Sequence, residues 1–204
     1  MIPTALSPRP PAPAKLKILE VADRLFYTEG VHTVGVDRII SEAHVTKATF
    51  YKHYRSKGVL IVAYVEGRHL RARLLVEEAR VDLTDPADVL RALATLIGQI
   101  ATRPGFHGCP FINAAAQFSD ATHPVRLAVT RHRVWERALA AGLIAELGHS
   151  AEEDAVDDLI LLRDGALSGS NVGDPDRAYR ALARAVERII AECSAEPAAH
   201  ALTA

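Results

Sequence analysis

The fold is decided by residues 43–57, Ala43-His-Val-Thr-Lys-Ala-Thr-Phe-Tyr-Lys-His-Tyr-Arg-Ser-Lys57. The centre of this stretch predicts a short helix from Lys47 to about Tyr54, with breaks on both sides that stop it from growing. Thr46 stands where its hydroxyl can cap that helix by accepting from the exposed N–H groups of the first turn. Phe50 and Tyr54 are four residues apart and therefore share one face, which we expect to point into a core.

Two further helices are predicted upstream of this one. A short helix runs from about Val36 to Ala43, and a longer helix begins at Lys15 and stops at Gly30. Helices of only about two turns are not stable alone in water, so both short helices need the longer one to pack against. Three helices in this order, the last two joined by a tight break, form a helix-turn-helix, whose second helix enters the major groove of DNA.

The outer side of the 47–54 helix is predicted to make the DNA contacts, because its side chains can hydrogen-bond to phosphates or base edges and none is acidic. The candidate residues are Thr46, Lys47, Thr49, Tyr51, Lys52 and His53, together with Lys57 at the start of the next helix. Residues 1–60 hold nine Lys or Arg against five acidic residues, whereas the remainder holds 15 against 20. A basic end suits a phosphate-binding head, although an ordinary solvated helical surface could have the same balance.

The stretch from Gly30 to Lys57 closely resembles the N-terminal signature of the tetracycline-repressor (TetR) family, which would cover about residues 15–65 of this chain. The positions with the residue type usual in that family are Ala43, Val45, Thr46, Lys47, Thr49, Phe50, Tyr51, His53, Tyr54, Ser56 and Lys57. Four positions depart from the pattern: Gly35 replaces Thr or Ser, Ile40 replaces Ala, His44 replaces the turn Gly, and Gly58 replaces an acid. None of these departures removes the basic face.

The resemblance implies a sequence-specific transcriptional regulator, and specifically a repressor. It would bind palindromic double-stranded operator DNA as a homodimer and leave it when a small-molecule effector binds. It implies no catalytic residue, no cofactor and no metal. An enzyme that uses Cys109 as its nucleophile is the alternative from another class, but no recognisable nucleophile motif accompanies that cysteine. A DNA-binding protein without any effector is a third interpretation that stays open.

The whole chain is predicted to be all-α, with a three-helix head and a body of about six helices. We expect a disordered arm at 1–14, a DNA-binding domain at 15–57, an effector-binding and dimerisation domain at 58–193, and a flexible tail at 194–204. Proline and glycine punctuation places body helices near 84–102, 109–119, 123–147, 151–169 and 175–193. No run approaches the ~18 uncharged apolar residues of a membrane span. The N-terminus lacks the apolar core of a secretory signal, so the expected location is the cytoplasm.

The last two predicted helices are expected to pair with those of a second copy, as the family resemblance implies. Apolar residues recur on them at helical spacing, and the candidate contact residues are Ile160, Leu167, Ala178, Leu182, Val186 and Ile189. The same stripes could instead form the core of a single chain, and the sequence does not decide between these interpretations.

The segment 107–117 resembles a Gly-Cys-x-x-x-Asn stretch that opens a central helix in one group of these regulators. Cys109 could be a thiol that senses oxidants or electrophiles, a metal ligand together with His107, or a small buried residue. An apolar effector cavity with a few polar groups is also expected in this region. Its candidate lining is Phe106, Cys109, Phe111, Asn113, Gln117, His132 and Trp135.

Overall fold

The computed structural model describes residues 12–194. Within that range the chain forms nine helices and no strand, which confirms the predicted all-α fold. Most of the predicted arm (residues 1–11) and the predicted tail after residue 194 lie outside the described residues. No helix in the described range is both long enough and apolar enough to span a membrane.

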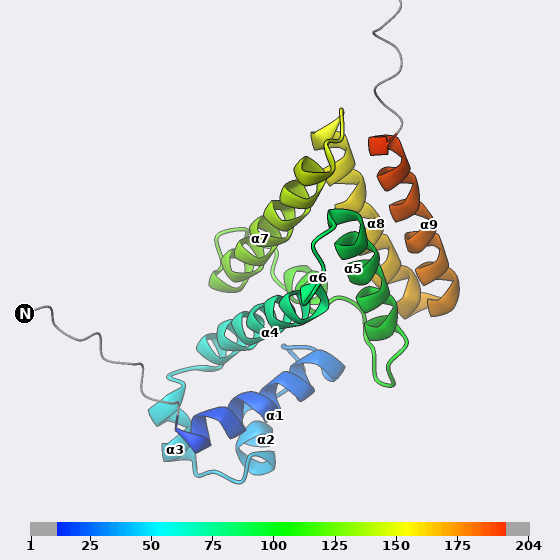
Figure 1. Ribbon diagram of the computed structural model, residues 1–204. Coiled ribbons are helices and arrows are strands. Elements are labelled where there is room, and N and C mark those ends of the chain that lie inside the picture. Colours follow the sequence, from blue (N-terminus) through cyan, green and yellow to red (C-terminus); the bar gives the residue numbers. More distant parts are fainter. Residues whose placement is uncertain (1–11, 195–204) are drawn as a thin grey trace, which may run out of the picture. The chain divides into compact units, whose positions relative to one another are not determined.

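The chain divides into two compact units, Met1–Tyr64 and Val65–Ala204, which we call the head and the body. The head contains α1 (Pro13–Glu29), α2 (Val36–Glu42), α3 (Lys47–His53) and the first turns of α4 (Lys57–Arg80) (Figure 1). The expected boundary after residue 57 would have placed all of α4 in the body. Its first turns belong to the head because Tyr64 packs edge-on against Phe26 of α1, with ring centroids 5.8 Å apart.

An apolar core joins the three helices of the head, and Ile18, Leu25, Ile39 and Phe50 are fully buried in it. Helix α1 begins at Pro13, two residues earlier than expected. Proline suits this position because its fixed φ is helical and the first turn has no use for its missing N–H. The helix ends at Gly30, whose φ of 87° favours glycine.

Two of the departures from the family pattern are visible in the backbone around α2. Gly35 is the N-cap of α2 in an extended conformation, and no side chain caps this helix end. His44 occupies the turn between α2 and α3 with a φ of 53°, a left-handed conformation that histidine tolerates better than most residues. The backbone therefore follows the expected helix–turn–helix path, although position 35 lacks a capping hydroxyl and position 44 lacks the usual glycine.

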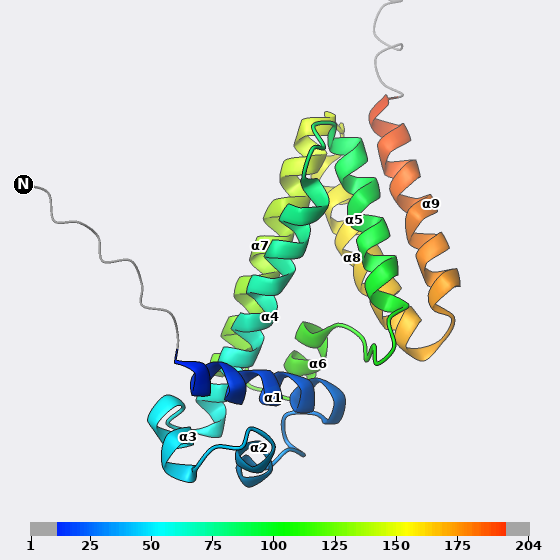
Figure 2. The same cartoon turned by 60° about the horizontal axis from the view of Figure 1, so that its bottom comes forward.

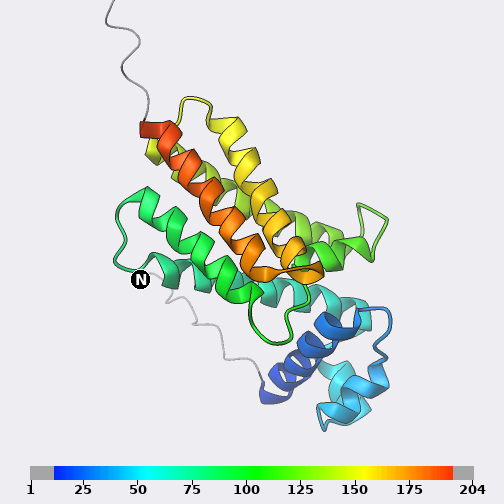
Figure 3. The ribbon, with the colours of Figure 1, turned by 90° about the vertical axis from the view of Figure 1, so that its right-hand side faces the viewer.

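The body continues from α4 into α5 (Pro86–Ala101), α6 (Pro110–Ala116), α7 (Pro124–Leu147), α8 (Glu152–Val172) and α9 (Pro175–Ser194). Four of these five helices begin at the proline that the sequence placed there. Helices α5, α8 and α9 run side by side (Figures 2 and 3). Together with α7 they enclose one apolar core, which includes Leu90, Leu143, Ile144, Val156, Leu182 and Ile189.

Candidate functional site

Thr46 caps α3 as the sequence predicts. Its hydroxyl oxygen accepts a hydrogen bond from the backbone N–H of Thr49 at 3.1 Å, and the two threonine hydroxyls lie 2.8 Å apart. On the opposite side of the helix Phe50 and Tyr54 are buried, and the Tyr54 hydroxyl donates to the carbonyl of Lys15 at 3.2 Å. The cap fixes where α3 begins, and the two aromatic rings fix which of its faces is left outside.

The outer face of α3 presents a basic and hydrogen-bonding surface. The side chain of Lys47 is 69% exposed and its ammonium lies 3.6 Å from the Asp37 carboxylate of α2. Tyr51 is 43% exposed, Lys52 is also exposed, and His53 is half-buried. No acidic residue lies on α3, so its exposed cations and hydroxyls suit an anionic partner such as a phosphate backbone, for which Lys47 would exchange its contact with Asp37.

Lys57 differs from the other candidate DNA contacts. Its ammonium donates to the backbone carbonyl of His32 at 3.3 Å, and partial burial lowers the pKa of its side chain. This bond ties the start of α4 to the loop between α1 and α2. Ser56 caps α4 next to it by accepting from the N–H of Val59 at 3.2 Å.

A network of four exposed charged residues fixes α2 against α1, and sequence reasoning missed it. The Arg38 guanidinium donates to Glu29 of α1 at 2.8 Å and to Glu42 at 2.9 Å, and Arg24 of α1 also donates to Glu42. These bonds hold the pKa of the Glu42 carboxyl below its ordinary value, chiefly through Arg24. The spacing of Arg38 and Glu42 by four residues is the signal that could have revealed part of the network.

In the body, three of the predicted effector-pocket residues, Phe111, His132 and Trp135, lie together. The Phe111 ring stacks on the His132 ring with centroids 3.3 Å apart and an interplanar angle of 10°. Trp135 lies beside the same histidine, with ring centroids 5.5 Å apart. His69 of α4, which the sequence did not single out, meets both residues and places its Nδ1 atom 3.1 Å from Nδ1 of His132.

The remaining polar residues of the predicted pocket hold α6 and the loop before it. The Asn113 amide donates to the carbonyl of His107 at 2.6 Å, and the Gln117 amide donates to the carbonyl of Asn113 at 3.2 Å. Phe106 is half-buried in that loop. The asparagine of the Gly-Cys-x-x-x-Asn stretch therefore has a structural role.

Cys109 is the N-cap residue of α6 and only 3% exposed. Its Sγ atom lies 3.5 Å from the Arg163 guanidinium. The preceding Gly108 has a φ of 82°, and a Cβ atom there would lie 3.5 Å from the Asn171 side chain. The low exposure favours the interpretation of Cys109 as a small buried residue, whereas the nearby guanidinium and the helix N-terminus are surroundings that reactive thiols also have. The described residues hold no group of three or more His, Cys, Asp or Glu side chains that could bind a metal, so the metal interpretation of Cys109 with His107 gains no further ligand.

A partly buried cluster of four charged residues joins α7 to α8 next to His132, and we call it the four-charge cluster. Glu136 accepts from Arg133 at 3.0 Å and from Arg163 at 2.7 Å. Asp164 accepts from Arg133 through both oxygens, at 2.9 and 2.7 Å, and from Arg163 at 2.7 Å. Burial alone would raise the pKa of the Glu136 carboxyl, but His132 and the two guanidinium charges hold it below its ordinary value.

Most of the predicted dimer contacts are buried within the single chain. Leu167, Leu182, Val186 and Ile189 are each at most 5% exposed within the single chain. The last three belong to the body core, Ile160 packs against that core, and Ala178 lies against Gly169 of α8. The predicted apolar stripes therefore face the chain's own helices, which is one of the two interpretations that the sequence left open.

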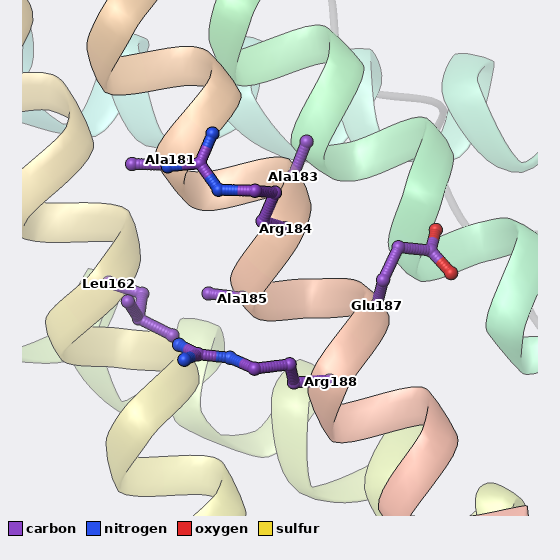
Figure 4. A pocket seen from close by; sticks show the side chains of 7 residues that line it. All are labelled: Leu162, Ala181, Ala183, Arg184, Ala185, Glu187 and Arg188. Carbon is purple, nitrogen blue, oxygen red and sulfur yellow. The ribbon is translucent and has the colours of Figure 1, made fainter.

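The outer side of α8 and α9 has a different set of residues. Leu161 is 68% exposed and Val172 is 86% exposed. The exposed Gly165 and Ser168 continue the same face of α8. An open groove follows α9, and Figure 4 shows Arg184 and Arg188 leaving that helix on one side and Glu187 on the other. The groove is lined by Leu162, Ala181, Ala183, Arg184, Ala185, Glu187 and Arg188.

Comparison with known proteins places this arrangement in one family. Residues 18–64 match the tetR family of bacterial regulatory proteins. The crystal structure of a TetR-family transcriptional regulator from Streptomyces coelicolor is 38% identical, with a TM-score of 0.85 over 89% of this chain and 96% of that one.

Curated relatives point the same way. An uncharacterized HTH-type transcriptional regulator of Mycobacterium tuberculosis is 29% identical over 135 residues, which are 65% of this chain and 62% of the relative. The HTH-type transcriptional regulator LmrA of Bacillus subtilis is 31% identical over 112 residues, or 54% of this chain and 60% of the relative. The match thus spans about three fifths of these two relatives. The helix-turn-helix head, the helical body and the likeness along almost the whole Streptomyces structure lead to one conclusion: the chain belongs to the TetR family of transcriptional regulators.

Proposed function

We propose that this protein is a homodimeric repressor that binds palindromic operator DNA through α3 and leaves it when a small molecule binds to the body. The observation that carries the proposal is the outer face of α3, which is capped by Thr46, lacks acids and exposes Lys47, Tyr51 and Lys52. DNA reading is assigned to residues 15–57, and effector binding and dimerisation are assigned to residues 58–193. A DNA ligand also places the protein in the cytoplasm.

Within the α3 face, Lys47 and Lys52 are assigned to phosphates, because an exposed ammonium suits an anionic oxygen. Tyr51, Thr49 and His53 are assigned to bases and sugars. Thr46 helps to position them by capping the N-terminus of α3. Lys57 keeps donors that are not used by the carbonyl of His32, so a phosphate contact remains open to it.

The test of the DNA assignment is selection of an operator from random DNA followed by binding measurements on variants. Lys47→Ala should weaken binding and reduce the slope of log affinity against log salt by about 1. Tyr51→Ala should weaken binding with little change in that slope. Lys17→Ala, which removes an exposed lysine from α1, is the matched control. Folded Lys47→Ala and Tyr51→Ala proteins that bind as tightly as the control would refute the assignment.

For the dimer, we propose the outer face of α8 and α9 in place of the residues first predicted. Exposed Leu161 and Val172 need a cover, and Gly165 and Ser168 let another helix approach closely. The first turn of α8 is acidic, while the exposed surface of α9 carries Arg184 and Arg188. The acidic end of α8 in one copy can therefore attract the basic surface of α9 in the other. A two-fold dimer would present its reading helices about 34 Å apart, one turn of DNA.

Sedimentation of two exposed-surface variants tests this face. Leu161→Arg combined with Ala181→Arg should give a monomer with weak operator affinity. Val134→Arg, at a position of α7 that is 64% exposed, should remain a dimer. A dimer that survives the double substitution would place the contact elsewhere.

The effector is proposed to bind around Phe111, His132 and Trp135, and its class is a small apolar or aromatic compound. Because Phe111 stacks on His132, the ligand must displace that ring or open the space beside it. A thermal-shift screen should find compounds that raise the melting temperature and release operator DNA, since binding shifts affinity at both sites equally. Phe111→Ala should change the affinity for such a compound while leaving operator binding in its absence intact.

A further inference from the structure

The His69–His132 pair joins α4 to α7. His132 also belongs to the proposed effector site, but the proposed function makes no use of its contact with His69. The two Nδ1 atoms lie 3.1 Å apart and the rings meet at an interplanar angle of 83°. His132 is 1% exposed, whereas His69 is partly exposed at the edge of the body. A short contact between two imidazole nitrogens requires that one of them donates a proton and the other accepts it.

The surroundings decide which ring donates. The Nε2 atom of His132 lies 3.2 Å from the Glu136 carboxylate, although not in hydrogen-bond geometry. The negative charge of that carboxylate favours the neutral tautomer of His132 that carries its proton on Nε2. Its Nδ1 atom is then an acceptor, and the shared proton belongs to His69. In this state both rings are neutral and the contact joins α4 to α7.

We propose that the His69–His132 contact is an acid-sensitive latch, which holds α4 against α7 at neutral pH and opens when both rings are protonated. A second proton on the pair would place N–H groups on both facing nitrogens, and the hydrogen bond would be replaced by repulsion between two imidazolium cations.

The charged groups around the pair make the protonated forms unfavourable. His69 faces Arg73 of its own helix and Arg131 of α7, while His132 faces Arg133 of its own helix and Arg163 of α8. Arg131 is paired with Glu66 of α4 at 2.7 Å, and the Glu136 carboxylate is shared between Arg133 and Arg163. Asp164 is likewise paired with both arginines. Burial is the largest cause that lowers the pKa of both histidines. At His69 the facing His132 and then the arginines add to it, while at His132 the Glu136 carboxylate opposes it and the arginines reinforce it.

The two nitrogens could also be imagined as ligands of one metal ion. A structural metal site needs further ligands, and the described residues hold no group of three or more His, Cys, Asp or Glu side chains suited to that purpose. The hydrogen-bonded pair accounts for the contact without any additional group.

Trp135 makes the latch observable, because it is the only tryptophan of the chain and its ring lies 5.4 Å from the ring of His69. A protonated imidazole quenches tryptophan emission on contact. As the pH falls, the emission of the full-length native protein should drop with a midpoint below about 6.5, the value of an exposed histidine. Over the same range, amide hydrogen exchange in the body part of α4 should accelerate.

His69→Asn is the decisive variant, because the asparagine amide can keep the donor near the position of Nδ1 but cannot be protonated. It should lose most of the fluorescence change and the acceleration of exchange. In denaturant unfolding, the unfolding equilibrium constant of wild type should rise by up to tenfold more for each unit by which the pH falls than that of His69→Asn does. This factor corresponds to the uptake of one additional proton on unfolding. The matched control is His44→Asn, an exposed histidine in a backbone conformation that asparagine also accepts.

Three outcomes would overturn the latch. They are a fluorescence midpoint at or above that of an exposed histidine, an acid response that His69→Asn retains in full, and a zinc-induced rise in melting temperature that His69→Asn abolishes. The last outcome would assign the pair to a metal. None of these measurements uses DNA, so failure of the latch leaves the proposed function untouched, and failure of the repressor proposal leaves the latch untouched.

Discussion

The ring of Tyr179 on α9 lies directly against Gly98 on α5. A Cβ atom placed on Gly98 would come within 2.5 Å of Cδ2 and 2.8 Å of Cγ of that ring. Because Cγ is close to the tyrosine backbone, the ring cannot swing away without moving α9. The glycine is therefore required by the close approach of two helices that frame the body core.

Gly98→Ala should destabilise the protein by about 1–3 kcal/mol, the usual cost of forcing extra volume into a packed contact. The matched control is Gly142→Ala on α7, where a Cβ atom meets nothing within 4 Å. There the better helix propensity of alanine should stabilise the protein by up to about 1 kcal/mol. Urea unfolding of both variants checks the opposite signs, and a Gly98→Ala protein as stable as wild type would contradict the packing argument.

Arg163→Leu should cost about 3–5 kcal/mol of stability, because it leaves the buried Glu136 and the half-buried Asp164 with only one guanidinium between them. Arg137, which pairs with Asp157 and also joins α7 to α8, provides the control because both side chains are at least half exposed. Arg137→Leu should change stability by no more than about 1 kcal/mol. Equal losses in the two variants would mean that burial does not distinguish these ion pairs.

Acid stability should depend on the network that joins α2 to α1. The folded pKa of Glu42 is below its unfolded value, so the stability that Glu42 contributes is present above the unfolded pKa and is lost as the pH falls through the folded pKa. Thermal melts from pH 6 down to 3 should therefore fall less steeply for Glu42→Gln than for wild type. Parallel acid limbs in the two proteins would show that the arginines do not hold this carboxylate.

The thiol of Cys109 should resist labelling in the folded protein. In a Cys193→Ser background, where Cys109 is the only cysteine, an aromatic disulfide reagent should react slowly in buffer and completely in denaturant, because the thiol is 3% exposed. Rapid, stoichiometric labelling of the native protein would instead revive the electrophile-sensing interpretation. Cys109→Ser would then be expected to abolish a thiol-dependent release of DNA.

Much of the helical framework was predictable because its signals are local. Thr46 caps α3 through an atom three residues away, and the prolines at the starts of α5, α6, α7 and α9 act within one turn. The inward direction of Phe50 and Tyr54 follows from helical spacing alone. Each of these inferences needs only the chain within a few residues of the position concerned.

The features that the sequence left undecided or did not reveal arise where distant segments meet. The stripe with Leu182, Val186 and Ile189 has the same helical period whether it faces another subunit or α5. The period alone therefore does not show which helix the stripe packs against. His69 is 63 residues from His132, and Arg133 is 31 residues from Asp164. Such pairs depend on the register between packed helices, which no local pattern encodes.

The four-charge cluster also restricts how this sequence can change over generations. Replacing such a cluster by well-packed apolar residues is often neutral or stabilising, whereas removing an arginine alone leaves the buried Glu136 carboxylate with less compensation. A route of single replacements to the apolar alternative therefore begins with a loss that is large beside a domain's total stability of about 5–15 kcal/mol. We therefore expect the four residues of the cluster to be inherited together, because each single replacement lowers the stability of the fold even where a fully apolar set would be as stable. They are Arg133, Glu136, Arg163 and Asp164.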